Sequence, residues 1–197
     1  HKVLLHSDAA QALGKIPLDV KAMNINLMSI TGHKVYGPMG LGALYVSNKP
    51  RVRLEPVFNG GGQEKNLRSG TLPPPLCVGF GKTCELAVTE MPTEAKSLEK
   101  MRDDLLERLT TKLDGIHING SMENRVSGNL NISIEDVDAE SLMAALPDLA
   151  MSSGSACTSA SEESSYVLKA IGLSNEMAEA SLRIGLGRFN TEDEVDY

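Results

Sequence analysis

The chain has 197 residues, of which 41% are hydrophobic, and a formal net charge of -7. This length suffices for one large or two small domains with real cores. The negative charge and the lack of a long basic run argue against a nucleic-acid partner, because phosphate backbones are bound by clustered Lys and Arg. The sequence has no stretch of 18 apolar residues and no signal-peptide pattern, so we expect a soluble protein that binds small metabolites or other proteins, not a membrane.

Both ends of the sequence indicate an internal fragment of a longer protein. The chain starts at His1 without a methionine and continues almost directly into an apolar stretch, residues 3–5, an expected strand with nothing before it to pair with. At the other end, Thr191 and Glu194 have the spacing of a capping box that begins a helix. The sequence stops about one turn later, at Tyr197, and so short a helix is not stable alone.

The first half, residues 1–92, alternates strand-like and helix-like segments. Apolar stretches at residues 3–5, 25–30 and 41–46 predict strands, and apolar residues at helical spacing predict a helix over about 76–91. Near-continuous apolar strands are typical of a sheet covered on both faces. This half is therefore expected to have the α/β layout.

The pattern changes around Pro92, and a smaller α+β unit is expected over residues 93–197. It begins with a helix whose apolar residues share one face and which ends at Asp114-Gly115, where glycine suits a left-handed cap. The remaining elements are predicted from apolar periodicity and from the cap and stop signals Asp138 and Pro147. They are, in chain order, a strand over 130–134, a helix over 139–146, a helix over about 162–170 and a strand over 182–186.

The three cysteines, Cys77, Cys84 and Cys157, are odd in number and lack CxxC spacing. They suggest neither a zinc site nor a disulfide framework, and they fit a reducing compartment. Cys77 and Cys84 lie in the helix predicted over 76–91 and are expected to be small packing residues. Cys157 lies in SSGSACTSAS, residues 152–161, among small polar residues. A flexible linker would have the same composition, but a lone exposed thiol is prone to oxidation, so its position is easier to explain if the sulfur has a function.

Lys34 stands where the apolar strand over 25–30 gives way to a glycine-rich turn, within SITGHKVYGPMGLGALY, residues 29–45. A lysine at the mouth of a strand, preceded by Thr31, Gly32 and His33, has the layout of a Schiff-base lysine beside a phosphate cradle. An ordinary surface lysine in a loop has the same local pattern. The rest of the chain must decide between these interpretations.

Asp8 follows the strand predicted over 3–5 at the end where α/β sheets bind ligands, and Lys34 follows the next strand at the corresponding end. Together they match the needs of pyridoxal phosphate, whose aldehyde takes a lysine amine and whose protonated pyridine nitrogen takes a carboxylate. Thr31 and His33 can donate hydrogen bonds to the phosphate, and Gly32 allows close backbone approach. Asp8 as a solvated turn residue is the simpler interpretation only when it is considered alone.

Arg183 lies between Leu182 and Ile184 in the strand predicted over 182–186, so period-two geometry places its side chain on the face opposite the core. There it can present its planar fork to a carboxylate, which lysine cannot match in geometry. An exposed arginine on a solvated face is equally compatible with this pattern. The signal at Arg188 is weaker.

Four segments together resemble the cysteine desulfurases that supply sulfur for iron–sulfur clusters, members of the class-V aminotransferase family. They are DAAQALGKIPLDV, MSITGHKVYGPMGLGALYV, NGGGQEKNLRSGTLP and SSGSACTSAS. The resemblance implies an α/β fold-type I architecture, with a large, mainly parallel sheet domain, a small C-terminal domain and a homodimer. Residues 1–92 would be the C-terminal part of the large pyridoxal-phosphate-binding domain, and residues 93–197 the small domain that carries the persulfide loop.

The resemblance also implies roles for individual residues. Lys34 would form the Schiff base, Asp8 would contact the pyridine nitrogen, and Gln11 the ring hydroxyl. Thr31 and His33, with Gly32 between them, would bind the phosphate; Thr31 stands where close relatives often have serine. Thr71, in RSGTLP, would reach the phosphate of the partner subunit.

The implied chemistry begins when free L-cysteine displaces Lys34 from the cofactor while Arg183 holds the substrate carboxylate. The Lys34 amine then removes the Cα proton, and Cys157 takes the sulfur as a persulfide, leaving L-alanine. Cys157 must act as a thiolate, and the histidine that the family uses near the cofactor lies before His1. The Cys157 loop is expected to swing between making and delivering the persulfide. Cys157 is also expected to pass sulfur to a scaffold protein and to help ligate an iron–sulfur cluster there.

Alternatives stay open at this point. A selenocysteine lyase or related sulfur-amino-acid lyase would use the same cofactor residues, although the loop around Cys157 favours a desulfurase. A non-catalytic module for sulfur transfer or scaffold binding would not need Lys34, Asp8 and Gln11 together. The fragment lacks the family's N-terminal half of the cofactor site, which puts its own activity in doubt. The bacterial cytoplasm and the mitochondrial matrix both fit, and the cytoplasm is the favoured expectation.

Overall fold

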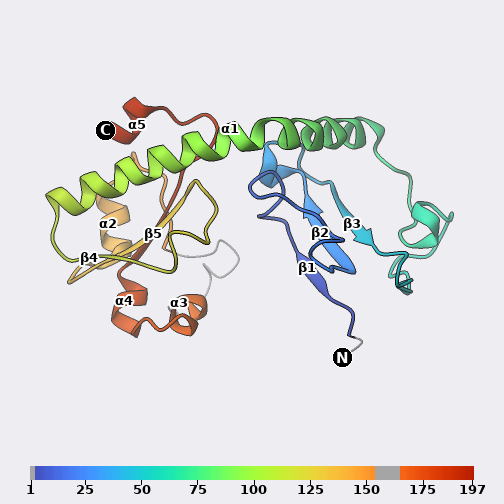
Figure 1. Ribbon diagram of the computed structural model, residues 1–197, viewed down its shortest axis with the longest axis horizontal. Helices are drawn as coiled ribbons and strands as arrows, with labels where there is room; N and C mark the ends of the chain where they lie inside the picture. The colour runs from blue at the N-terminus through green and yellow to red at the C-terminus, as the bar shows by residue number, and fades with distance from the viewer. Residues whose placement is uncertain (1–2, 154–164) are drawn as a thin grey trace. The chain divides into compact units, whose positions relative to one another are not determined.

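The computed structural model describes residues 3–153 and 165–197, and the chain divides into two compact units, His1–Pro92 and Thr93–Tyr197 (Figure 1). Each unit has its own three-stranded sheet and its own buried residues. Within the described ranges, no helix combines the length and the apolar character needed to cross a membrane. The assignment of the first unit to a larger cofactor-binding domain, and of the second to a small C-terminal domain, stays a prediction.

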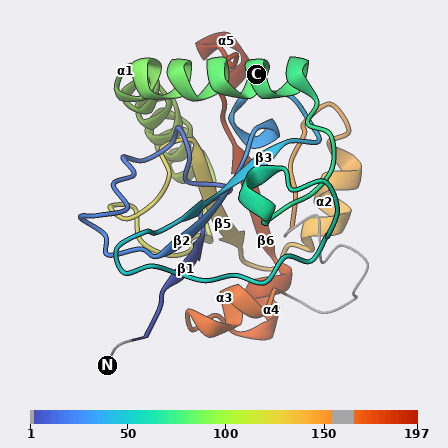
Figure 2. The ribbon, with the colours of Figure 1, turned by 90° about the vertical axis from the view of Figure 1, so that its right-hand side faces the viewer.

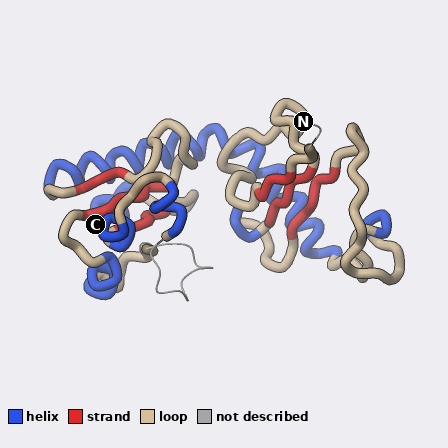
Figure 3. The backbone as a smooth tube through the Cα atoms, turned by 90° about the horizontal axis from the view of Figure 1, so that it is seen from below, coloured by secondary structure: helices blue, strands red, loops and turns tan. Residues whose placement is uncertain are grey.

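The sheet of the first unit has the strand order β1-β2-β3 and is drawn in red in Figure 3. β1 (His6–Asp8) runs parallel to β2 (Leu27–Thr31), whereas β3 (Gly42–Val46) is antiparallel to β2. These strands form a mixed sheet, where the resemblance implied a mainly parallel one. β2 and β3 begin two residues and one residue later than predicted.

The strand predicted over residues 3–5 is wrong, because the ladder with β2 begins at His6, opposite Leu27. Asn26 binds both backbone groups of Leu5, the residue just before β1. The Asn26 backbone N–H donates to the Leu5 carbonyl at 3.0 Å, and the Asn26 Oδ1 accepts from the Leu5 N–H at 2.9 Å. Leu5 therefore leads into the strand, and its side chain is 51% exposed. Apolar composition alone placed the strand three residues too early.

The two faces of this sheet differ in their cover. Successive strand residues point to opposite faces, so Met28 lies on one face and Ser29 on the other. Met28 is 4% exposed, whereas Leu44, which pairs with Ser29 and shares its face, is 49% exposed. The described residues thus cover one face well, not both faces as expected. Polar strand residues gather on the open face.

A single helix, α1 (Pro74–Lys112), runs through Pro92 and belongs to both units. The sequence predicted a break there, because proline lacks an N–H and its ring crowds the carbonyl four residues earlier. One proline removes only one of the helix's hydrogen bonds, however, and buried residues anchor the helix on each side of it. These are Phe80 and Ala87 before Pro92, and Leu98 and Met101 after it.

The second unit contains an antiparallel sheet in the order β4-β5-β6. Its strands are β4 (Ile116–Ile118), β5 (Asn129–Ile134) and β6 (Ser181–Gly185). The core of this unit is a cluster of Leu130, Ile132, Ala139 and Leu182. Alternate residues of β5 and β6 supply this core, as the period-two pattern predicts. The short strand β4 was not predicted, because three residues carry too little periodicity.

The described part of the second unit also has four short helices: α2 (Ala139–Ala145), α3 (Tyr166–Ala170), α4 (Asn175–Glu179) and α5 (Glu192–Asp196). The helix predicted over 162–170 is described only from its cap, Ser165, onward, and α4 was not predicted. α3 and α4 lie side by side (Figures 1 and 2). These helices begin at side-chain caps, which satisfy backbone N–H groups that have no partner inside the helix.

Two predicted caps are confirmed. Asp138 Oδ2 accepts a hydrogen bond from the Ser141 N–H at 2.8 Å at the start of α2. At the start of α5, the Glu194 N–H donates to Thr191 Oγ1 at 3.3 Å, and Glu194 Oε2 accepts from the Thr191 N–H at 3.0 Å. These two bonds are the reciprocal pair that defines a capping box.

Candidate active site

The parallel strands β1 and β2 end at the same edge of the first unit's sheet. Asp8 is the last residue of β1 and lies opposite Ser29, two residues before the end of β2 at Thr31. The sequence placed Asp8 beyond a strand over residues 3–5; it is instead part of the strand, but still at its carboxyl end. Asp8, Ser29 and Thr31 share one face, as does His6, whose Nε2 lies 2.9 Å from Ser29 Oγ.

Lys34 follows directly from this edge, in the 3-10 helix η1 (His33–Val35). The turn is closed by bonds from the Val35 and Gly37 N–H groups to the Gly32 carbonyl, at 3.1 and 2.9 Å. Val35 is 4% exposed, so it anchors the turn, while the neighbouring Lys34 is exposed. A buried residue beside an exposed one holds the lysine amine outside the core, near the ends of β1 and β2.

Thr31 and His33 form a polar pair at the start of this turn, because Thr31 Oγ1 lies 3.0 Å from His33 Nδ1. When the hydroxyl donates to Nδ1, the His33 Nε2 carries the proton and is a donor. The threonine, the imidazole and the exposed Lys34 amine therefore follow one another within four residues. In this arrangement His33 Nε2–H and the Lys34 amine are donors suited to an anion, while the Thr31 hydroxyl proton is held by His33 Nδ1.

Gly32 is required by packing within the chain. A Cβ at this position would lie 2.9 Å from the Pro38 carbonyl oxygen and 3.1 Å from the Phe80 ring. The Gly32 N–H already donates to the Leu41 carbonyl at 3.0 Å. Pro38 and Phe80 thus occupy the space that a side chain at position 32 would need. A direct role for Gly32 in binding phosphate stays a prediction.

The turn after β1 carries Gln11 and packs on η1. Asp8 Oδ1 accepts from the Ala10 N–H at 2.9 Å, and the exposed Gln11 follows. Gly14 has φ +69, and a Cβ there would lie only 2.5 Å from Val35 Cγ2. Next to it, Lys15 Nζ lies 4.8 Å from the centre of the Tyr36 ring. These contacts bring the Asp8–Gln11 segment and the Lys34 turn together.

Thr71 lies apart from this group in the segment between η2 (Glu64–Asn66) and α1. Its side chain is exposed. The segment is organised by its own bonds: the Gly70 N–H donates to Gln63 Oε1 at 3.0 Å, and Arg68 stacks on Phe58 at 4.9 Å. In residues 3–153 and 165–197, no hydrogen bond or ion pair joins Thr71 to the residues around Lys34. Its predicted role, across a dimer, stays a prediction.

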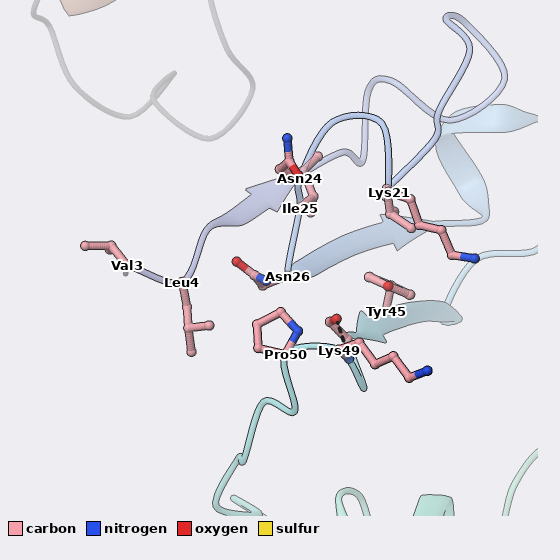
Figure 4. Close-up of a pocket in the computed structure, with 11 residues that line it drawn as sticks. Val3, Leu4, Lys21, Asn24, Ile25, Asn26, Tyr45, Lys49 and Pro50 are labelled. Atoms are coloured by element: carbon pink, nitrogen blue, oxygen red, sulfur yellow. Dashed lines mark hydrogen bonds between the residues drawn. The ribbon is translucent and has the colours of Figure 1, made fainter. Parts of the chain in front are cut away.

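A hollow of about 510 Å³ opens at the other edge of the same sheet, where β1 and β2 begin. Its lining includes Leu4, Lys21, Asn26, Tyr45 and Lys49 (Figure 4). None of the predicted site residues that the structure describes lines it. The predicted chemistry therefore belongs to the open edge at the carboxyl ends of β1 and β2.

Arg183 lies in the second unit, in the middle of β6 and half-buried. Its neighbour Leu182 is 2% exposed in the core, so the predicted alternation holds. The Arg183 N–H donates to the Ser152 carbonyl at 2.6 Å, and the Ser152 N–H donates back to the Arg183 carbonyl at 3.2 Å. On the other side, Arg183 pairs with Asn131 of β5. Neither Ser152 nor Asn131 was predicted from the sequence to be a neighbour of Arg183.

Cys157, with its predicted persulfide and metal roles, lies outside the described residues. Cys77 and Cys84 are half-buried free thiols on α1, as expected of packing residues. Burial raises the pKa of the Cys84 thiol, because a thiolate loses hydration there. In the part of the chain that the structure describes, no group of three or more His, Cys, Asp or Glu side chains could hold a metal ion.

The model of the family "Aminotransferase class-V" matches residues 1–197. The chain belongs to this family. Class-V aminotransferases depend on pyridoxal phosphate, and the predicted fold-type I architecture is confirmed by related structures. A NifS-like protein from Rickettsia africae ESF-5 superposes with a TM-score of 0.86 at 30% identity, covering 98% of this chain and 51% of that one. SspA in complex with cysteine gives 0.77 at 36% identity, covering 97% and 52%.

Named relatives of this class-V chain are cysteine desulfurases. The mitochondrial enzyme of Arabidopsis thaliana is 55% identical over 196 residues, which are 100% of this chain and 43% of that protein. Cysteine desulfurase IscS of Rickettsia rickettsii (strain Iowa) is 54% identical over 195 residues, 99% of this chain and 48% of that protein. The chain thus spans about half the length of the curated relatives it matches.

Proposed function

We propose that this chain supplies the lysine and the sulfur-carrying cysteine of a pyridoxal-phosphate-dependent cysteine desulfurase. The observation that carries the proposal is the edge where parallel β1 and β2 end with Asp8 and, just beyond Thr31, Lys34. Such an edge is where open α/β sheets bind their ligands. The predicted loop cysteine, Cys157, lies in the same chain, and the named relatives are cysteine desulfurases.

The residues at this edge fit pyridoxal phosphate by their chemistry. Lys34 would hold the cofactor through its exposed amine, and the Asp8 carboxylate would face the pyridine nitrogen. Thr31 and His33, 3.0 Å apart through Oγ1 and Nδ1, would hold the phosphate. Gln11, in the turn that packs on η1, would bind the ring hydroxyl. When bound, the cofactor supplies an electron sink for the charge that develops at the substrate Cα.

In this mechanism three residues of the chain act on L-cysteine. Arg183 binds the carboxylate of L-cysteine, because its planar fork matches two carboxylate oxygens. The Lys34 amine removes the Cα proton and later returns a proton. The Cys157 thiolate attacks the substrate sulfur, so that an S–S bond forms as the Cβ–S bond breaks. L-Cysteine and the Cys157 thiol thereby become L-alanine and a Cys157 persulfide: Cβ is reduced and sulfur is oxidised.

The proposal extends to the partners of the whole protein. A homodimer would let Thr71 reach the phosphate in the partner subunit, consistent with its exposed position outside the Lys34 group. The persulfide would pass to an iron–sulfur scaffold protein and to other sulfur acceptors, and Cys157 would help to ligate a cluster at the scaffold. A reducing compartment, the bacterial cytoplasm or the mitochondrial matrix, would keep the Cys157 thiol reduced and able to accept sulfur.

The test uses the full-length protein loaded with pyridoxal phosphate and supplied with L-cysteine. We expect alanine and protein-bound persulfide in equal amounts in a single turnover without added reductant. Free sulfide and alanine without persulfide would indicate a lyase, and a strong preference for L-selenocysteine in a parallel reaction would identify a selenocysteine lyase. Sulfur transfer from an added persulfide donor, with no alanine from cysteine, would indicate a non-catalytic module.

A further inference from the structure

The sheet of the second unit has a polar face that is organised by a buried hydrogen-bond network. In β5, Leu130 and Ile132 enter the core, while Asn131 and Ser133 point to the opposite face. Ser133 is 0% exposed, and Asn119, just after β4, is 5% exposed. Buried polar groups of this kind are normally hydrogen-bonded, so the direction of each bond is worth tracing.

The network has one consistent set of proton positions. Ser133 Oγ lies 2.7 Å from the Met177 carbonyl, which can only accept, so the hydroxyl proton of Ser133 points there. Ser133 Oγ must then accept the bond of 2.8 Å to Asn119, which therefore presents its NH₂ group. The second N–H of that group lies 2.7 Å from the Asn131 carboxamide, which must offer its oxygen.

The Asn131 amide orientation follows from this chain of bonds. With Oδ1 turned toward Asn119, its NH₂ group points away from the buried network. Among the described residues this NH₂ group has no hydrogen-bond partner. Its nitrogen is also not among the fully buried side-chain atoms that lack a hydrogen bond. Asn131 is half-buried, and its amide nitrogen is an oriented donor that no described residue engages.

Arg183 stands directly opposite Asn131 in the β5–β6 ladder. Both backbone polar groups of Arg183 bond to Ser152, on the outer side of β6. They therefore point away from β5, and Asn131 and Arg183 form a non-hydrogen-bonded pair. In antiparallel sheets the side chains of such pairs share a face and come closest, with Cα atoms about 4.5 Å apart.

We propose that Asn131 is a second substrate-binding residue, which donates a hydrogen bond to the α-carboxylate that Arg183 holds. This inference rests on the proposed function, because it takes the substrate to be an α-amino acid. A guanidinium fork and an amide NH₂ on one face supply donors only, together with one positive charge. That combination matches a planar anion with one negative charge and four lone-pair sites.

The test replaces Asn131 in the full-length, cofactor-loaded protein. Asn131→Asp keeps the oxygen that accepts from Asn119 but exchanges the donor for a negatively charged acceptor. Asn129→Asp is the matched control, because Asn129 lies on the same face of β5 and pairs with Gly185 instead of Arg183. Two ligands are titrated by calorimetry: L-alanine, which has the carboxylate, and ethylamine, which lacks it.

We expect Asn131→Asp to weaken L-alanine binding roughly 10- to 100-fold, as for the loss of a bond to a charged group, and to leave ethylamine binding unchanged. Asn131→Ala should weaken L-alanine binding about 10-fold, again without affecting ethylamine. Asn129→Asp should change the ratio of the two affinities by less than about threefold. This ratio separates carboxylate recognition from a general loss of structure.

Two outcomes would overturn the assignment of Asn131. Either both Asn131 variants keep the wild-type ratio of L-alanine to ethylamine affinity, or they weaken both ligands equally. In either case we expect Arg183→Ala to lower the affinity for L-alanine. That result would support the proposed function even though Asn131 has no role in it. If the wild-type protein itself shows no carboxylate-dependent binding, the proposed function fails first, and that failure is distinguishable from the failure of Asn131.

Discussion

Ser152 and Arg183 exchange two backbone hydrogen bonds, of 3.2 and 2.6 Å, although they are 31 positions apart in the chain (183 − 152). The contact fixes the start of the segment that leads to Cys157 against the strand that carries the proposed carboxylate-binding arginine. Ser181 Oγ donates to the Ala178 carbonyl at 2.7 Å and lies 3.5 Å from the Ser153 carbonyl. Arg183 and the last residues described before Cys157, Ser152 and Ser153, thus meet at one edge of β6.

Lys34→Ala in the full-length protein should abolish the visible absorbance of the lysine-bound cofactor, because no other amine replaces it in η1. Absorbance spectra after reconstitution with pyridoxal phosphate measure this. Lys21→Ala is the control, since Lys21 lines the hollow at the opposite edge of the sheet and should leave the spectrum unchanged. An unchanged spectrum in Lys34→Ala would exclude the lysine assignment.

Cys157→Ser should keep the cofactor spectrum and lose the protein-bound persulfide, because an alcohol cannot accept the sulfur. Mass spectrometry of protein exposed to L-cysteine measures the persulfide. Cys84→Ser should retain it, because burial raises the pKa of the Cys84 thiol and keeps it protonated. Persulfide on Cys84 in the wild-type protein would contradict this division of roles.

Arg183→Ala and Arg188→Ala should have different effects. Loss of the Arg183 fork should weaken L-cysteine binding roughly 10- to 100-fold with little change in stability, because a bond to a charged group is worth about 1.5–3 kcal/mol. Arg188 instead binds the Glu94 carboxylate, whose side chain is 8% exposed, at 2.8 Å through Nε. Arg188→Ala should therefore destabilise the second unit by about 1–3 kcal/mol.

Substrate titration and urea unfolding distinguish these two arginines. Unchanged L-cysteine affinity in Arg183→Ala would support a merely solvated arginine. Unchanged stability in Arg188→Ala would show that the pair with Glu94 contributes nothing measurable.

Gly14→Ala should disturb the Lys34 turn. The new Cβ would lie 2.5 Å from Val35 Cγ2 at a φ of +69. We expect a loss of roughly 2–4 kcal/mol from backbone strain and overpacking, and weaker cofactor binding as η1 shifts. Gly40→Ala is the matched control: its φ is +85, but a Cβ there has no atom within 4 Å. Equal urea midpoints for both variants would show that the contact with Val35 is unimportant.

Asp138 connects helix capping to pH. The Ser141 side chain and its backbone N–H hold the pKa of Asp138 below its ordinary value of 3.8. Since the folded-state pKa is the lower one, the carboxylate stabilises the folded state above the unfolded value, and this contribution is lost as pH falls through the folded value. Asp138→Asn keeps an accepting oxygen but does not titrate.

The wild-type advantage over Asp138→Asn in thermal midpoint should therefore shrink between about pH 5 and about pH 3. Thermal unfolding followed by circular dichroism measures it. A constant difference over this range would show that the cap does not depend on the charge of Asp138.

Local sequence signals predicted elements whose determinants lie within a few residues of each other. The Asp138 cap and the Thr191–Glu194 capping box follow from side chains that reach their own backbone, and the alternation in β5 follows from a two-residue period. The strand over residues 3–5 failed because strand limits depend on the partner: β1 begins where His6 meets Leu27. The break at Pro92 failed because burial on both sides holds α1 together.

The sequence by itself determined the chemical inventory: Lys34 after an apolar strand, Asp8 after an apolar stretch, and Cys157 among small polar residues. Motif identity is a property of local order, so it can be read without coordinates. Only the tertiary structure decided which groups are neighbours and which way their protons point. Ser152, Asn131 and Arg183 come from three distant segments, and strand pairing alone brings them together. The donor direction at Asn131 follows from a buried network that local sequence patterns do not encode.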